Sequence, residues 1–241
     1  MALQKTLTVY TSYLQKHFSC FLWGLSTFIV GNTYSQTIVK EFIRDSAHIY
    51  LSNCAFKKNK KIPLQYDTPV NVALLYFPEL DNTEIRIRVK KQASPLTARP
   101  TMFAFFRKTS KRKYIITISN KTDSKFLPVL LNNLSFDSQI GVIGHELSHI
   151  SDYNKRYGIY FLKLFCMHLI KKKMDHFEYN TDMRCIDHGL GYQLLSWSKE
   201  VRFKLNLTQW KGVKHVNKPG RERYMNPESI TKAISQKQIY N

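Results

Sequence analysis

The residues with the clearest chemical meaning are His145, Glu146 and His149, which form the H-E-x-x-H pattern within the run GVIGHELSHI. On a helix, residues four apart lie on one face, with about 6 Å between their β-carbons. Both imidazoles can therefore reach one metal ion, and the carboxylate of Glu146 lies beside it, where it can take a proton from water. Apolar neighbours predict a buried helix, and Gly141 and Gly144 permit close backbone approach. The alternative is an ordinary amphipathic helix with histidine and glutamate on its surface.

A catalytic zinc normally has three protein ligands and an open position for water, so one more ligand must come from elsewhere in the chain. Glu178 is the favoured candidate because it begins an E-x-x-x-D pattern that ends at Asp182, on an expected helix. This spacing places both carboxylates on one face, so that one can bind metal while the other orients a ligating histidine. A surface acidic pair is the alternative. Four further residues are weaker candidates because they are isolated or too near the histidines: Asp152, His168, His176 and His188.

HELSH followed by EYNTD resembles the gluzincin class of zinc metallopeptidases, the clan of thermolysin and of the HtpX-like and CAAX-processing membrane peptidases. The interval between the two motifs is short, so the chain is most similar to compact members, and residues 138–195 carry the resemblance. It implies Zn²⁺ as the cofactor, bound by His145, His149 and Glu178. It also implies that Glu146 is the general base and that Asp182 supports the first histidine.

The residue that stabilises the oxyanion in that class has no motif of its own here. Histidine, tyrosine or arginine usually serves, and the candidates are Tyr153, Tyr157, His188, Tyr192, His215, Arg223 and Tyr224. Arg223 and Tyr224 are favoured, because a tail that returns to the cleft would bring both a cation and a phenol. The metzincin pattern is excluded, since it requires glycine at Asp152 and histidine at Lys155.

The strands that must support the motif follow from hydrophobic patterning. Strict alternation in Thr83–Val89 (TEIRIRV) and the β-rich run Lys113–Ser119 (KYIITIS) each predict a strand. Further strands are predicted at residues 70–77 and 102–106, and a loop at residues 93–101 because of its prolines. By position, Lys113–Ser119 is the expected edge strand, against which an extended substrate would lie.

Amphipathic and apolar runs predict helices around the motif. They are expected at residues 37–53, from Ser135 or Asp137 to about Tyr153, at 159–170, and from Asp175 to residue 197. The lysines at 171–173 are expected at a helix C-terminus, where they complement the dipole. The predicted fold class is α+β, with a small mixed sheet packed on the active-site helix and a mainly helical C-terminal half. The resemblance makes this fold zincin-like.

The N-terminal segment predicts where the protein acts. Residues 18–30 are uncharged and apolar, too few to span a bilayer comfortably, and they precede the small residues Thr33 and Ser35. This layout favours a signal peptide at residues 1–35, over an uncleaved anchor or a buried helix of a cytosolic domain. One domain would follow at 36–241, with 201–241 a basic C-terminal extension. The expected location is extracytoplasmic, either periplasmic or secreted.

The composition describes a folded, strongly basic domain with a net charge of +20 and 43% hydrophobic residues. Such a charge indicates anionic surroundings. No nucleic-acid-binding signature is present, so the expected partners are a peptide or protein substrate and an anionic membrane or polymer surface. Cys54, Cys166 and Cys185 leave two states open, a disulfide with a free thiol or three reduced cysteines.

Together these features predict a secreted zinc metalloendopeptidase, with peptide-bond hydrolysis by a zinc-activated water and Glu146 as the base. One alternative is a non-catalytic basic module that binds a membrane or polymer surface, with structural zinc or none. A cytosolic, DNA-associated H-E-x-x-H protease is a further alternative that the charge would suit.

Overall fold

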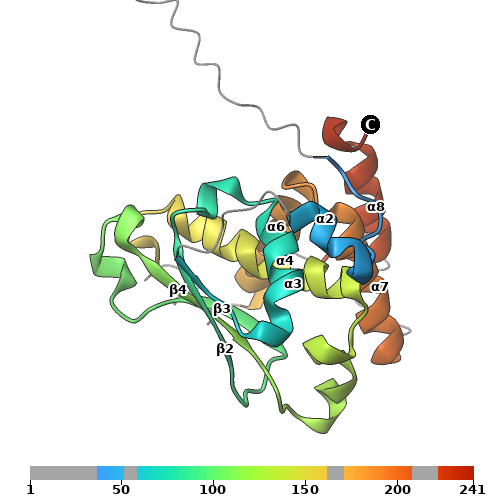
Figure 1. Cartoon of the computed structure of the whole chain (residues 1–241), viewed down its shortest axis with the longest axis horizontal. Helices are drawn as coiled ribbons and strands as arrows, with labels where there is room; N and C mark the ends of the chain where they lie inside the picture. Colours follow the sequence, from blue (N-terminus) through green and yellow to red (C-terminus); the bar gives the residue numbers. More distant parts are fainter. Residues whose placement is uncertain (1–36, 52–58, 162–170, 208–221) are drawn as a thin grey trace, which may run out of the picture. The chain divides into compact units, whose positions relative to one another are not determined.

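A four-stranded mixed sheet and the long helix α4 (Phe136–Asn154) organise the protein (Figure 1). The computed structural model describes residues 37–51, 59–161, 171–207 and 222–241. The signal peptide expected at residues 1–35 and most of the helix expected at 159–170 lie outside these ranges. The other α-helices are α2 (Ala47–Leu51), α3 (Asp67–Leu74), α6 (Lys171–Asp187), α7 (Gly191–Lys204) and α8 (Pro227–Ser235). The predicted α+β class is confirmed.

The sheet has the order β1-β2-β4-β3. Its strands are β1 (Lys60–Lys61), β2 (Glu84–Val89), β3 (Leu96–Pro100) and β4 (Lys113–Ile118). β2 is parallel to both β1 and β4, whereas β3 is antiparallel to β4. In β2, Ile85 and Ile87 are buried while Arg86 is exposed, so the alternation that predicted this strand is confirmed.

Short 3₁₀ helices connect these elements. They span Arg44–Ser46, Leu64–Tyr66, Pro78–Leu80, Ala104–Phe106, Thr109–Lys111, Ser124–Val129, Leu131–Asn133 and Gln238–Tyr240. Residues 102–106 were predicted as a strand, and this prediction was wrong, because Ala104–Phe106 form one of these 3₁₀ turns. Met102 and Phe103 are exposed beside it, and a strand would have buried one of its faces.

Helix α4 lies at the centre of the helical layer, packed against α3, α6, α7 and β3. Its first turn is capped by the hydroxyl of Ser135, one of the two candidates, which accepts a hydrogen bond from the backbone N–H of Ser138. Gly141 lies where α4 meets α7: a β-carbon there would be 2.2 Å from the carbonyl oxygen of Gln193. The close approach predicted for this glycine is therefore confirmed.

The strand predicted at residues 70–77 was wrong, because this segment lies in α3 and the turn that follows it. Every residue from Pro69 to Leu74 is buried. A helix buried on all sides gives a continuous apolar run without a period, and such a run cannot be told from a buried strand.

The loop expected at residues 93–101 contains β3, and β3 is an edge strand of the sheet. Its Pro100 is compatible with that position, since an edge strand need not donate all of its N–H groups. The expectation that Lys113–Ser119 forms the edge was wrong, because β4 pairs with β2 on one side and β3 on the other.

Three helix predictions require correction. The helix expected from Asp175 to residue 197 is split at Gly189, whose φ of 90° ends α6 before α7 begins. Asp175 is an interior residue of α6, and the lysines at 171–173 lie in the first described turn of that helix, not at a C-terminus. Within residues 37–51, only the 3₁₀ turn at 44–46 and α2 are helical.

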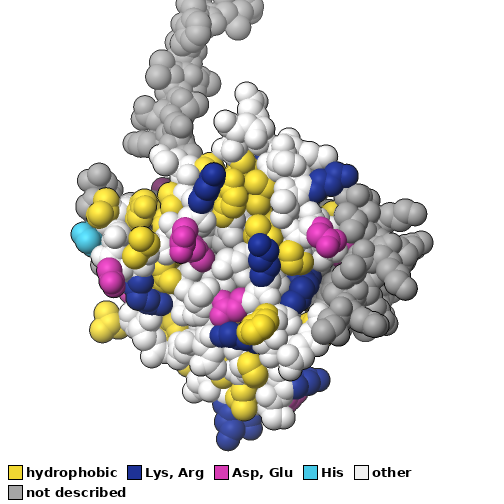
Figure 2. All heavy atoms as spheres, turned by 90° about the vertical axis from the view of Figure 1, so that its right-hand side faces the viewer, with side chains coloured by type: hydrophobic (Ala, Val, Ile, Leu, Met, Phe, Trp, Pro, Cys, Tyr) yellow, Lys and Arg dark blue, Asp and Glu magenta, His cyan; other side chains and the backbone are white. Residues whose placement is uncertain are grey.

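The C-terminal part of the chain packs on the helical layer. Ile230, Ala233 and Ile234 of α8 are buried, and α8 contacts both α6 and α7. Over the face that carries α7 and α8, Lys and Arg side chains are interspersed with Asp and Glu (Figure 2). Cys185 is a buried free thiol. No helix of the described ranges is long and apolar enough to cross a membrane.

Candidate metal centre

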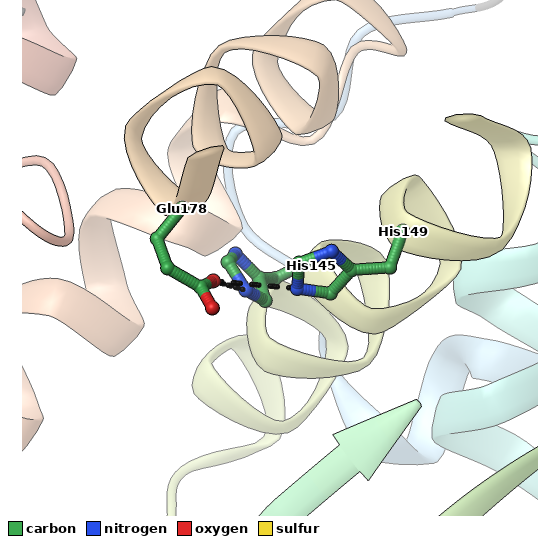
Figure 3. A group of neighbouring side chains, drawn as sticks. All are labelled: His145, His149 and Glu178. Carbon is green, nitrogen blue, oxygen red and sulfur yellow. Dashed lines mark hydrogen bonds and ion pairs between the residues drawn. The ribbon is translucent and has the colours of Figure 1, made fainter. Parts of the chain in front are cut away.

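His145 and His149 of α4 and Glu178 of α6 form a buried cluster (Figure 3). The Nε2 atoms of His145 and His149 lie 3.2 Å and 3.3 Å from the same carboxylate oxygen, Oε2 of Glu178. The three ligand atoms lie within 4.8 Å of one another. In a tetrahedral zinc site with bonds of about 2.0–2.1 Å, two ligand atoms lie about 3.3 Å apart. The two nitrogen–oxygen spacings therefore fit a bound zinc ion.

The second nitrogen of each imidazole is engaged away from this cluster. Nδ1 of His145 lies 2.7 Å from Oδ1 of Asp182, an ionised acceptor. Nδ1 of His149 lies 3.3 Å from the hydroxyl oxygen of Thr181, and that hydroxyl donates to the carbonyl of Phe177. A hydroxyl has one proton, so Thr181 accepts from His149. In the tautomer protonated at Nδ1, each histidine would present the lone pair of Nε2 on the side of the glutamate, where it could bind a metal ion.

Three lone-pair atoms that face one another require positive charge between them. A bound metal ion would supply it, as would a proton on one of the imidazoles. Burial lowers the pKa of His145, but the carboxylates of Asp182 and Glu178 outweigh it and raise that pKa well above its ordinary value. For Glu178 burial acts in the other direction and raises the pKa, but His149 and His145 together hold that pKa far below its ordinary value. The three residues lie close enough together to bind a metal ion.

Glu146 lies next to the cluster and faces the sheet. Its side chain is buried, and the backbone of Ala98 in β3 is near enough to lower the pKa of its carboxyl group. Burial raises the pKa of Glu146 above its ordinary value, although the nearby His149 and His145 oppose this effect. A carboxylate with a raised pKa is suited to accept a proton and later to release it.

A cavity of about 640 Å³ opens beside His145 and Glu146. Its wall is mainly apolar and combines β3, the 3₁₀ segments before α4, and α7. Its apolar residues include Leu96, Phe126, Leu134, Val142, Trp197 and Val201. A cavity of this size and character, next to converging polar groups, is typical of a ligand-binding site.

Tyr224 and Arg223 also line this cavity. The ring of Tyr224 lies 5.6 Å from that of His145. The side chain of Arg223 is half-exposed, and its Nε lies 3.8 Å from a carboxylate oxygen of Asp175. Trp197 was not anticipated from the sequence, yet its ring lies 5.7 Å from that of His145. A tryptophan on a helix face has no spacing signal that would distinguish it from a core residue.

The structure also places the C-terminal segment against the centre, and the hydrogen bond that holds it there has no signal in the sequence. The backbone N–H of Met225 donates to Oδ2 of Asp182 at 2.7 Å. Asp182 therefore holds the imidazole with one oxygen and a distant part of the chain with the other.

The remaining candidates lie away from the cluster or only at its border. Asp152 is paired with Arg156 and Arg184. His188 is paired with Glu79. Tyr153 stacks on the ring of His149, and Tyr192 packs against Tyr240. His176 and Tyr157 are exposed. His168 and His215 lie outside the described residues.

Comparison with protein-family models, curated proteins and solved structures finds no match to this chain. The function of the centre is therefore inferred from its own residues and geometry.

Proposed function

We propose that the chain is a zinc-dependent metallopeptidase of the gluzincin type, with a zincin-like fold, in which His145, His149 and Glu178 hold the metal. One observation carries this proposal: two Nε2 atoms converge on one carboxylate oxygen while both Nδ1 atoms are hydrogen-bonded elsewhere. Two histidines and a glutamate are a ligand set of catalytic zinc sites, and they leave a position open for water.

Zinc bound by this set supplies Lewis acidity, which polarises a peptide carbonyl and acidifies water. Glu146 accepts a proton from the attacking water and returns it to the leaving nitrogen. Asp182 keeps His145 in the tautomer that presents Nε2. Within the described chain, β3 pairs with β4 only, so its other edge offers backbone groups to an extended peptide. The apolar cavity beside Glu146 would receive side chains of that peptide.

The test compares the wild type with Glu146→Gln. The wild type is expected to contain about one zinc per chain and to hydrolyse casein or a peptide. Glu146→Gln should retain zinc but hydrolyse the substrate about 10²–10⁴-fold more slowly, because only the proton acceptor is removed. Glu228→Gln, on the exposed side of α8, is the matched control and should leave both quantities unchanged.

A zinc-free wild type would contradict the proposed metal centre. Hydrolysis that survives in Glu146→Gln would contradict the role of Glu146. Zinc binding without any hydrolysis would instead support the alternative, a non-catalytic module with a structural metal.

A further inference from the structure

Two segments that follow β3 and α4 expose large apolar side chains to solvent. Met102 and Phe103 are 74% and 61% exposed. Tyr157 and Ile159 are 87% and 73% exposed. Single exposed apolar residues are common on proteins, but a concentration of large ones marks a binding surface.

Buried Arg112 joins these two segments. Its Nη1 donates to the backbone carbonyls of Tyr153 at 2.9 Å and Arg156 at 2.6 Å, and its Nε donates to that of Arg107 at 3.3 Å. Its guanidinium also lies over the ring of Phe161. Residues 101–111 and 155–161 therefore form one end of the domain, at the left of Figure 1. We call these two ranges the apolar–basic end.

Cations accompany the apolar side chains at this end. Arg107, Lys108, Lys111 and Lys155 are all exposed; Arg156 is exposed as well, but it pairs with Asp152. Neither range of the apolar–basic end contains an aspartate or a glutamate. This differs from the face in Figure 2, where both signs of charge are interspersed.

We propose that the apolar–basic end docks the protein on the surface of an anionic lipid bilayer. Met102, Phe103, Tyr157 and Ile159 would enter the interfacial layer, while the lysines and arginines lie among the lipid head groups. This combination of apolar insertion and basic charge is what interfacial membrane binding requires. An acidic polymer such as RNA would satisfy the cations but leave the apolar side chains in water. A second copy of the chain would present the same positive charge and be repelled.

Docking would also orient the candidate metal centre. Helix α4 rises about 1.5 Å per residue, so Lys155 lies about 14 Å along the helix axis from Glu146, the α4 residue of the cavity nearest to it. A peptide in the neighbouring cavity would therefore be held near the membrane surface. The docking proposal does not depend on the proposed hydrolysis, because no residue of the apolar–basic end belongs to the metal centre.

The test uses hydrogen exchange of the full chain, read by mass spectrometry. With vesicles of phosphatidylcholine and phosphatidylglycerol in equal parts, exchange should slow in residues 101–111 and 155–161. It should stay unchanged in α8, and pure phosphatidylcholine vesicles should have no effect. This local readout is independent of the apolar run at residues 18–30, which could bind lipid by itself.

Matched substitutions separate the apolar and the basic contributions. Met102→Ser with Phe103→Ser should raise the lipid concentration for half-maximal protection of residues 155–161 by about ten-fold. Lys108→Ala with Lys111→Ala should raise it by about 30-fold, since each cation near an anionic surface contributes about 1 kcal/mol. The control pairs an exposed aromatic and an exposed lysine of α7, Phe203→Ser with Lys199→Ala, and should change nothing.

Three results would overturn the proposal. The first is the absence of protection with anionic vesicles. The second is protection by RNA that equals protection by anionic vesicles and that persists in the Met102→Ser, Phe103→Ser variant. This result would identify a polyanion as the partner. The third is a wild-type dimer that the same variant converts to a monomer without any effect on vesicle binding. Glu146→Gln should dock as the wild type does, so loss of hydrolysis and loss of docking are distinguishable.

Discussion

Asp182→Asn is the substitution that most directly tests how the centre is oriented. Asp182 accepts two hydrogen bonds of 2.7 Å, from Nδ1 of His145 and from the backbone N–H of Met225. Asparagine has the same shape but only one acceptor end. Whichever way the amide lies, its NH₂ group faces another donor.

The magnitude follows from which contact is lost. If the amide oxygen stays at His145, the N–H of Met225 loses its partner, and a buried hydrogen bond to a charged group contributes about 1.5–3 kcal/mol to folding. If the amide is reversed, the imidazole must take the other tautomer, and Nε2 carries a proton and cannot bind metal. Loss of such an orienting partner lowers metal affinity about 10–100-fold, equivalent to about 1.4–2.8 kcal/mol.

Zinc affinity is measured by competition with a chromophoric chelator, and metal-free stability by thermal unfolding in EDTA. Asp182→Asn should unfold at a lower temperature if the amide oxygen stays at His145, and should bind zinc at least about ten-fold more weakly if the amide is reversed. Asp187→Asn is the matched control on the same helix. That carboxylate is half-exposed and pairs with Lys237, so its replacement should leave zinc affinity unchanged.

A variant that keeps a zinc affinity within about two-fold of the wild type and also the wild-type unfolding temperature would refute the reasoning. It would mean that neither hydrogen bond of Asp182 matters to the centre or to the fold. Loss of stability alone would show that the amide oxygen stays at His145.

Three further substitutions probe the packing, the ionisation and the cavity. Gly141→Ala places a β-carbon against the carbonyl oxygen of Gln193 and should reduce the free energy of unfolding in urea by at least about 1–3 kcal/mol; equal stability would mean that α4 and α7 separate freely. Burial would raise the pKa of Glu79, but hydrogen bonds, led by that from His188, lower it to about 2. Because this folded-state pKa lies below the unfolded value, the stabilisation exists above about pH 4.5 and is lost as the pH falls toward 2. Glu79→Gln should therefore be about 1–2 kcal/mol less stable at pH 6, after allowance for partial exposure, and equal to the wild type near pH 2; a difference that persists in acid would exclude this cause. Given the proposed function, Tyr224→Phe should keep zinc and lower kcat about 10²-fold if the Tyr224 hydroxyl stabilises the oxyanion. An unchanged kcat would exclude that role.

The ligand-bearing helices could be predicted because the helical period is a local property. His145 and His149 share a face of α4, and Glu178 and Asp182 share a face of α6, whatever the rest of the chain does. The chemistry of a zinc site then indicated that the two faces meet. Tyr224 was favoured only on the assumption that the tail returns to the cleft, because no local pattern shows how a distant segment packs against α6.

Strand order was beyond the sequence for a different physical reason. Leu96–Pro100 has a proline just before it and one at its end, and only its pairing with β4 makes it a strand. Local propensity cannot show a partner that is distant in the chain. As a result, the strand beside Glu146 was mistaken for a loop, and β4 was mistaken for the edge.

The hydrogen bond from Met225 to Asp182 makes the metal centre and the C-terminal segment interdependent. A carboxylate with only one engaged oxygen could rotate away from His145, whereas one held at both oxygens keeps Nδ1–H fixed and Nε2 directed at Glu178. Two hydrogen bonds thus connect the segment around Met225 to the imidazole of His145, so the position of this segment affects the direction of Nε2. The two effects are thermodynamically linked. If the C-terminal segment strengthens cation binding when it packs against Asp182, then a bound cation stabilises that packing by the same free energy.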